Sequence, residues 1–279
     1  MEGLFSFLNI PMDTPPSFGW FHFLWVAIAI AATTLLIIKF KDCSDKAYRR
    51  IALIAWLIML VFEIYKQIVF TFEWNGTEVV GDYQWYAFPF QLCSTPLYIL
   101  PFVAFMKEGK VRDYFASFIS TFALFGGLVV FIYPNDVFID TLGINIQTMV
   151  HHGLQIAIGI FFAVHARRRL NIKYFIKSIP VFIGLMIIAI ILNEAVWPAI
   201  AVNNPSDSFS MFYVSSHYPN HLPLLSMVYG AVPWIAFVFI YIIGFAIAAL
   251  AVHYAIFGCI KLSKFISKQG FFNKKNAKL

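Results

Sequence analysis

Residues 86–101 read YAFPFQLCSTPLYILP, and this stretch decides how the rest of the chain is interpreted. It is apolar enough to lie in a membrane, yet it carries Cys93, a glutamine, two hydroxyl side chains and three prolines. A helix surrounded by lipid gains nothing from such residues, because polar groups and prolines leave hydrogen-bonding groups unsatisfied in hydrocarbon. We therefore expect this stretch to be buried within protein, with other polar groups at the depth of Cys93.

The composition around this stretch is that of an integral membrane protein. Of the 279 residues, 61% are hydrophobic and 12% are charged, whereas soluble proteins carry about 25% charged residues. The three cysteines form no disulfide framework, and no pair has the spacing of a zinc ligand motif. The first 18 residues contain no Lys or Arg, so they lack the basic region of a cleaved signal peptide and the first apolar run is expected to remain.

Seven apolar runs are long enough to cross a bilayer, which requires about 20 helical residues. They cover residues 19–40, 50–72, 85–106, 111–133, 145–165, 174–193 and 229–260. The sequence therefore predicts an all-α, polytopic membrane helix bundle of seven transmembrane helices. No soluble domain interrupts it, so residues 1–279 form a single domain, with residues 194–228 as the longest outer loop.

The basic residues predict the orientation of this bundle. All but one of the 20 Lys and Arg residues fall in the turns after the first, third and fifth runs and in the tail, and Lys66 is the exception. Cytoplasmic loops of membrane proteins are enriched in Lys and Arg. The sequence thus predicts an outside N-terminus and a cytoplasmic C-terminus, and it explains the net charge of +6 without a nucleic-acid partner.

With this orientation, the polar residues inside the runs gather in the outer half of the membrane. Cys93 lies roughly 12 Å below the outer end of its run, and His151 and His152 lie roughly 9–10 Å deep, at 1.5 Å per residue. Glu63 and Lys66 share a helix face in the outer half of the second run. Five amides extend this set of candidates: Gln67, Gln91, Gln147, Gln155 and Asn193. Ionisable residues inside a membrane are costly and point to a functional site.

The spacing along the fifth run separates the two histidines. Gln147, His151 and Gln155 recur every four residues and form one polar stripe, whereas His152 lies about 100° around the helix. We therefore favour His151 as the partner of Cys93. In that case a histidine would take the thiol proton and the thiolate would attack an acyl carbonyl, with Gln91 or Asn193 donating to the oxyanion.

Each of these features also has a simpler interpretation. A buried cysteine is commonly a small hydrophobic side chain, and an intramembrane Glu63–Lys66 pair can serve only to neutralise itself and join helices. A metal site built from Cys93 and the two histidines is disfavoured, because adjacent histidines on one helix do not readily share one ion.

The order of short motifs resembles the YwaF-like family of bacterial integral membrane proteins. Phe90-Gln91-Leu92-Cys93-Ser94 is similar to the family's PLHLC-type motif, although Gln91 stands where a histidine is usual. The pair His151-His152, Asn193 at the end of the sixth run, and Tyr229-Gly230-Ala231-Val232-Pro233-Trp234 complete the likeness. The family is similar in turn to a eukaryotic cysteine-dependent phospholipid acyltransferase. That resemblance implies Cys93 and His151 as the catalytic pair, with His152 as the alternate.

The sequence therefore predicts a cysteine-dependent acyltransferase or acyl hydrolase that acts on phospholipids in a cavity open to the outer leaflet. Cys93 would be the nucleophile, and Glu63 and Lys66 would orient groups or bind charge. No cofactor or metal is expected, and the partners are membrane phospholipids, with the bacterial plasma membrane as the expected location. The alternative is a transporter or receptor that binds a small or lipid ligand in the same cavity without chemistry.

Overall fold

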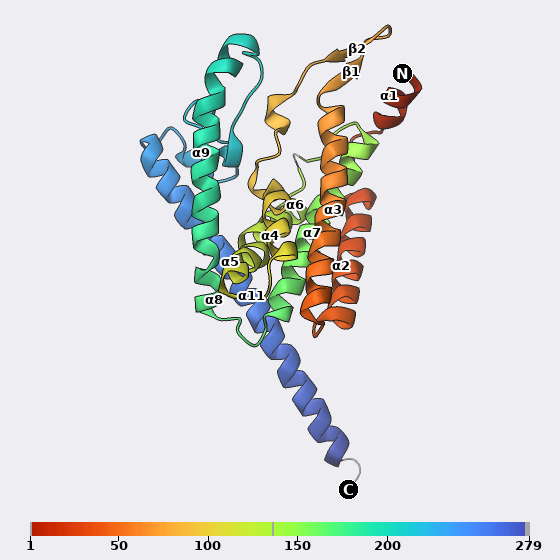
Figure 1. Cartoon of the computed structure of the whole chain (residues 1–279), viewed down its shortest axis with the longest axis vertical. Helices are drawn as coiled ribbons and strands as arrows, with labels where there is room; N and C mark the ends of the chain where they lie inside the picture. Colours follow the sequence, from red (N-terminus) through yellow and green to blue (C-terminus); the bar gives the residue numbers. More distant parts are fainter. Residues whose placement is uncertain (1, 136, 277–279) are drawn as a thin grey trace.

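The structure is a computed structural model that describes residues 2–135 and 137–276. Within these residues, six helical stretches are long and apolar enough to cross a membrane, and Figure 1 shows them as one bundle. They are α2 (Trp20–Phe40), α3 (Asp45–Val69), α5 (Lys110–Phe118) continued through the π-helical turn η3 (Ile119–Ala123) into α6 (Leu124–Ile132), α7 (Leu142–His165), α8 (Ile172–Ile176) followed by α9 (Ser178–Asn203), and α11 (Trp234–Asn276). The chain is a multi-pass membrane protein.

Short elements connect the long helices, most of them at the end that carries the N-terminus in Figure 1. Strands β1 (Phe72–Trp74) and β2 (Val79–Gly81) form an antiparallel hairpin in which Glu73 pairs with Val80. The remaining short elements are helices α1 (Glu2–Leu8), α4 (Pro96–Phe105) and α10 (Leu225–Val228), and the 3₁₀ turns η1 (Trp85–Ala87), η2 (Leu92–Ser94) and η4 (Met211–Tyr213).

The expected third transmembrane helix over residues 85–106 is interrupted. Its N-terminal half consists of η1, extended residues and η2, and regular α-helix begins only at Pro96. Six helices, not seven, therefore meet the length and composition for a span within the described residues, and α4 with η2 is a shorter apolar segment. Proline supplies no N–H to a helix and clashes with the preceding turn, which accounts for the irregular backbone.

Each carbonyl group that these prolines leave without a helical donor finds another one. Pro96 has no N–H to donate to the Leu92 carbonyl. This carbonyl instead accepts hydrogen bonds from the Thr95 hydroxyl at 2.6 Å and the Thr95 N–H at 3.3 Å. The Leu97 carbonyl, opposite Pro101, accepts a bond from the Trp56 indole at 2.9 Å. Irregular backbone at membrane depth is tolerated only when protein satisfies it, and here side chains do so.

Two helices extend beyond the runs expected from the sequence. Helix α9 continues to Asn203, so Asn193 and Glu194 lie inside it and the expected outer loop 194–228 begins about three helical turns later than predicted. The segment after Glu194 is apolar (AVWPAIAV) and carries its helix through Pro198. Helix α11 runs for 43 residues and projects from the bundle in Figure 1.

The basic turns meet at one end of the bundle. Arg112 pairs with Asp45, and Arg167 pairs with Asp42. Asp113, whose side chain is 8% exposed, accepts Arg169 at 3.0 Å and Lys177 at 2.8 Å. These pairs join the turns that follow α2, α4 and α7, and in Figure 1 all three turns lie at the end from which α11 projects. The common end that the charge pattern requires is present, and its cytoplasmic location stays a prediction.

Helix α7 lies at the centre of the bundle and is the most buried of the six spans. In its most apolar window 67% of the residues are buried, against 22% in α2, α3 and α11. A membrane helix that carries several amides and histidines must bury them against protein, because lipid offers no hydrogen-bond partner. The central position of α7 therefore follows from its polar residues, and it brings them next to η2.

Candidate functional site

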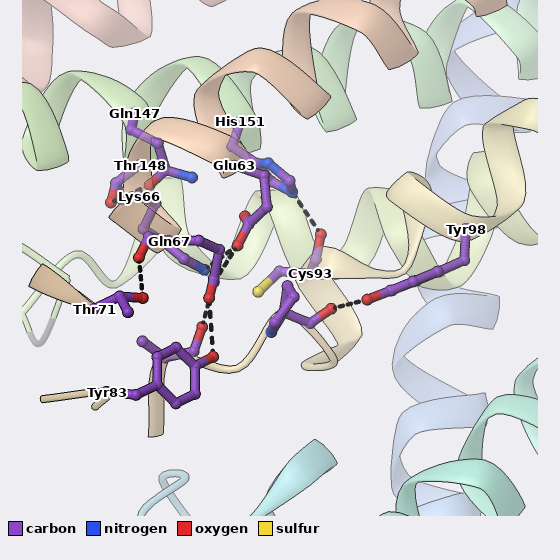
Figure 2. Close-up of polar contacts among 12 residues, drawn as sticks. Glu63, Lys66, Gln67, Thr71, Tyr83, Cys93, Tyr98, Gln147, Thr148 and His151 are labelled. Carbon is purple, nitrogen blue, oxygen red and sulfur yellow. Dashed lines mark hydrogen bonds and ion pairs between the residues drawn. The ribbon is translucent and has the colours of Figure 1, made fainter. Parts of the chain in front are cut away.

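Two side chains of α7 bind the backbone carbonyl of Cys93. The Nε2 atom of His151 lies 2.9 Å from this oxygen, and the Nε2 atom of Gln155 donates to it at 2.7 Å. The two donors lie one helical turn apart on one face of α7, so they can reach a single acceptor. Cys93 and His151, which the sequence predicted at matching depth, are thus in direct contact, as Figure 2 shows. Gln155, predicted on the same helix stripe as His151, binds the same carbonyl.

The local backbone makes this carbonyl available. Cys93 lies in η2, just before α4 begins with Pro96 in its first turn. A 3₁₀ turn followed by a proline does not continue the α-helical ladder through Cys93. Its carbonyl oxygen is therefore free to accept bonds from another helix, and α7 supplies them.

The hydrogen bonds assign the tautomers of the two histidines. A carbonyl oxygen only accepts, so the Nε2 atom of His151 carries the proton that is donated to Cys93. Its Nδ1 atom is then an unprotonated acceptor, and within the described residues this buried atom has no hydrogen-bond partner. His152 bonds back to its own helix, through Nδ1 to the Thr148 carbonyl at 2.7 Å. Of the two imidazole rings, that of His151 is the one hydrogen-bonded to Cys93.

A second polar group on α3 faces the same region. Glu63 Oε1 accepts the Lys66 ammonium at 2.8 Å and the Gln67 amide at 2.7 Å. The Tyr83 hydroxyl donates to Gln67 Oε1 at 2.9 Å. In Figure 2 the Cys93 side chain points toward Glu63 and Gln67, and the charges of Glu63 and Lys66 act on Cys93 electrostatically.

Tyr83 is a member of this group that the sequence did not single out. Burial raises the pKa of Tyr83 to about 12, so its phenol stays protonated and remains a donor to Gln67 at neutral pH. Tyr98, which donates to the Pro89 carbonyl at 2.8 Å, was missed in the same way. For Tyr98 the signal was its place in the polar stretch, where irregular backbone requires donors nearby. Tyr83 has no such signal, because its acceptor Gln67 lies on α3.

Two predicted amide residues serve the outer loop. Asn193 holds the backbone of Met211 through both of its atoms, at 3.1 Å to the carbonyl and 2.7 Å from the N–H. Gln91 donates to the Ser210 carbonyl at 2.9 Å. The loop after α9 is thereby fastened to both α9 and the segment before Cys93. Gln147 is buried on the α7 stripe, where Thr148 contacts it at 3.5 Å.

Four polar atoms around Cys93 are buried and without a hydrogen-bond partner within the described residues. They are Gln91 Oε1, His151 Nδ1, His152 Nε2 and Gln155 Oε1. Buried polar groups are nearly always hydrogen-bonded, so a cluster of exceptions indicates a bound water, a ligand or a reactive role. No group of three or more His, Cys, Asp or Glu side chains in the described part of the chain could hold a metal ion.

Two adjacent glycines in α6 allow the close packing that builds the site. A side-chain carbon on Gly127 would lie 2.9 Å from Gln155 Cβ and 3.0 Å from the His152 carbonyl oxygen. The same carbon on Gly126 would lie 3.8 Å from Cys93 Cα, an ordinary contact. Gly127 therefore sets the spacing between α6 and α7. Gly126 packs against the Cys93 backbone, where a methyl group would still fit.

We expect Gly127→Ala to destabilise the folded protein by about 1–3 kcal/mol, the usual range for overpacking, even though alanine gains up to about 1 kcal/mol of helix propensity. Gly126→Ala, one residue away in the same helix, gains the propensity without the clash and serves as the control. Thermal unfolding in one detergent measures both variants. Equal midpoints for the two would contradict the role assigned to Gly127.

The side chain of Cys93 is partly accessible, whereas both histidines beside it are buried. A pocket of about 650 Å³ lies elsewhere, between α1, β1 and residues 139–141. We call it the outer pocket because the charge pattern predicts that this end of the bundle faces outward. None of the predicted site residues lines it. The cavity expected around Cys93 therefore stays a prediction, and the outer pocket is a separate feature.

A family model described as the TMEM164 family matches residues 17–257, a range that contains all the residues of the candidate site. No curated protein and no solved structure gives a significant match to the chain. The likeness of the short motifs to YwaF-like proteins stays a prediction.

Proposed function

Because the chain belongs to the TMEM164 family of multi-pass membrane proteins, we propose that it is a cysteine-dependent acyltransferase or acyl hydrolase of membrane phospholipids. Cys93 is the nucleophile and His151 is the base. The proposal rests above all on one observation: His151, from the central helix, is bound to the residue that carries the thiol. This bond goes to the backbone carbonyl of Cys93, and it keeps the imidazole beside the residue whose thiol it would deprotonate. The pairing of a nucleophile with a base is the usual signature of covalent catalysis.

In the first step, His151 Nδ1 takes the proton of the Cys93 thiol, and the thiolate sulfur attacks the ester carbonyl carbon of a phospholipid. The tetrahedral intermediate collapses with cleavage of the ester C–O bond. The leaving oxygen takes the proton back from His151 and departs as the hydroxyl group of a lysophospholipid. Cys93 is left as an acyl thioester, and no electrons are exchanged with another molecule.

In the second step, a hydroxyl group attacks the thioester carbonyl. The hydroxyl belongs to a second lysophospholipid for transfer, or to water for hydrolysis. Its proton passes to His151 Nδ1, the C–S bond breaks, and the departing thiolate recovers that proton. Gln155 has a second amide hydrogen beyond the one on the Cys93 carbonyl, and this donor is suited to stabilise the oxyanion of both steps.

The Glu63–Lys66 group gives the site its charge balance. The Lys66 ammonium is partly buried, with a side-chain exposure of 16%, and is neutralised by Glu63 at 2.8 Å. A net neutral pair tolerates burial better than one charge alone. In the proposed reaction Lys66 offsets the negative charge that develops on the sulfur and on the ester oxygen, while Gln67 and Tyr83 keep Glu63 in place.

Detection of the acyl-enzyme tests the proposal directly. The purified protein is incubated with a phospholipid and digested, and the Cys93 peptide is analysed by mass spectrometry for an acyl mass that hydroxylamine removes. We expect the acyl group on Cys93, with Cys43 and Cys259 unmodified as internal controls. Phospholipid turnover by the parent protein with no acylated Cys93 at any time point of the reaction would eliminate the nucleophile role.

The unpaired polar atoms around Cys93 also suit a site that binds a ligand without chemistry. This is the second candidate function, a transporter or receptor. In that case a lipid or small ligand would bind with the same affinity to the parent and to Cys93→Ser, and no acyl thioester or lysophospholipid would form.

A further inference from the structure

The outer pocket carries an inference that does not depend on Cys93. Its volume of about 650 Å³ falls in the range of small-molecule sites, roughly 300–1,000 Å³. It lies where the C-terminal end of α3, the β1–β2 hairpin, helix α1 and the turn before α7 meet. In Figure 1 these elements gather at the end of the bundle opposite the projecting part of α11.

The residues that line this pocket are of two chemical kinds. Aromatic side chains come from the end of α3, from β1 and from the segment after β2, and two carboxylates complete the charged part of the lining. The residues of these two kinds that the argument uses are Phe70, Phe72, Trp74, Tyr86, Glu73 and Asp140. No Lys, Arg or His belongs to the lining.

The charge of this lining is not neutralised by protein. The side chains of Glu73 and Asp140 are exposed, and within the described residues neither is in an ion pair. Lys66 is the basic residue nearest along α3, and it is already paired with Glu63. The pocket is therefore a negatively charged hollow with aromatic walls.

Such a surface has a specific chemical preference. The face of an aromatic ring attracts cations, and rings arranged around a hollow recognise quaternary ammonium groups. Carboxylates add Coulomb attraction that is modest in water and larger near protein. An anion would be repelled by both carboxylates. An uncharged apolar ligand would displace water from the carboxylates and offer no hydrogen bond or charge in return, which is unfavourable.

The segments that build the pocket are held in place by hydrogen bonds. The Tyr65 hydroxyl donates to the Leu8 carbonyl at 2.7 Å, and the Met12 N–H donates to the Asp140 carbonyl at 2.9 Å. Phe70 and Tyr86 pack edge to face at 5.8 Å, and the Gln84 N–H donates to the Phe70 carbonyl at 2.9 Å. A largely pre-formed pocket binds with less loss of conformational entropy.

We propose that this pocket binds an organic ammonium group at the outer end of the bundle. The group can arrive on a phospholipid headgroup, or as a free small amine. Both carry the same cation, so the pocket chemistry is shared and the two sources are separated by experiment.

The test uses full-length Cys93→Ala protein in detergent, so that turnover cannot consume the ligand. Binding is followed by thermophoresis with three probes: tetramethylammonium, a short-chain phosphatidylcholine, and a short-chain phosphatidylglycerol that lacks the ammonium group. We expect the phosphatidylcholine to bind at least tenfold more tightly than the phosphatidylglycerol. If tetramethylammonium binds saturably, a free small ammonium ion is sufficient for binding. If phosphatidylcholine binds and tetramethylammonium does not, the ammonium group must arrive on a phospholipid headgroup.

The double variant Glu73→Gln with Asp140→Asn should weaken binding of the ammonium probe at least tenfold. The matched control is Glu78→Gln with Asp82→Asn, which removes the same charge from exposed residues of the same hairpin region outside the pocket lining. Trp74→Leu should also weaken binding, whereas Trp74→Phe should retain most of it. Equal affinity in the pocket and control variants, or equal binding of the two phospholipids, would overturn the proposal.

Discussion

Replacement of Cys93 by alanine is expected to lower phospholipid acyl transfer or hydrolysis by at least about 1,000-fold. Removal of a covalent nucleophile eliminates the thioester route, and losses of that order or larger are typical. The readout is the release of lysophospholipid from a mass-labelled phospholipid by purified protein. Cys93→Ser should be nearly as inactive, because a serine hydroxyl is far less nucleophilic than a thiolate at neutral pH.

The chain offers two matched cysteine controls. Cys43 lies in the turn between α2 and α3, and Cys259 is exposed on α11. Cys43→Ala and Cys259→Ala should each keep parental activity. Thermal unfolding of all the cysteine variants shows whether the fold is retained. Parental turnover in a folded Cys93→Ala variant would end the nucleophile hypothesis.

Replacement of His151 by alanine is expected to lower turnover by about 100- to 10,000-fold, the usual contribution of a positioned general base. This residue has two separable roles, because Nε2 binds the Cys93 carbonyl while Nδ1 has no hydrogen-bond partner among the described residues. His151→Gln keeps an amide donor that can reach the carbonyl but removes the base. It should therefore be as inactive as His151→Ala.

His152 provides the comparison for this prediction. It is adjacent in sequence and buried to a similar degree, but its ring bonds to the Thr148 carbonyl of its own helix. His152→Ala should reduce turnover far less than His151→Ala at equal protein stability. A His151→Gln variant with parental turnover would show that His151 only positions Cys93. A larger loss of turnover in His152→Ala than in His151→Ala would identify His152 as the base.

The amino-acid sequence was sufficient for the class of protein. Apolar runs of about 20 residues have few alternatives to membrane helices, and basic residues in alternate turns require those turns to meet at one end. Ion pairs such as Arg112–Asp45 join these turns in the structure. The spacing of Gln147, His151 and Gln155 also predicted their shared helix face, since helical periodicity is a local property.

The residue partners depended on the tertiary structure. Hydropathy could not show that residues 85–95 are irregular, because the donors that replace the missing proline N–H groups come from distant positions such as Trp56. The same applies to Asn193, a candidate oxyanion donor by sequence, whose amide holds Met211. Side-chain hydrogen bonds between helices leave no periodic pattern in the amino-acid sequence from which they could be predicted.

The stretch around Cys93 shows separately what the sequence and what the tertiary structure contributed. Its sequence predicted that the segment is buried within protein, because its polar residues and prolines leave groups that lipid cannot satisfy. Only the packing of whole helices, in which Gly127 sets the spacing between α6 and α7, decided that His151 and Gln155 bind the Cys93 carbonyl. Contacts between residues about 60 positions apart depend on how whole helices pack.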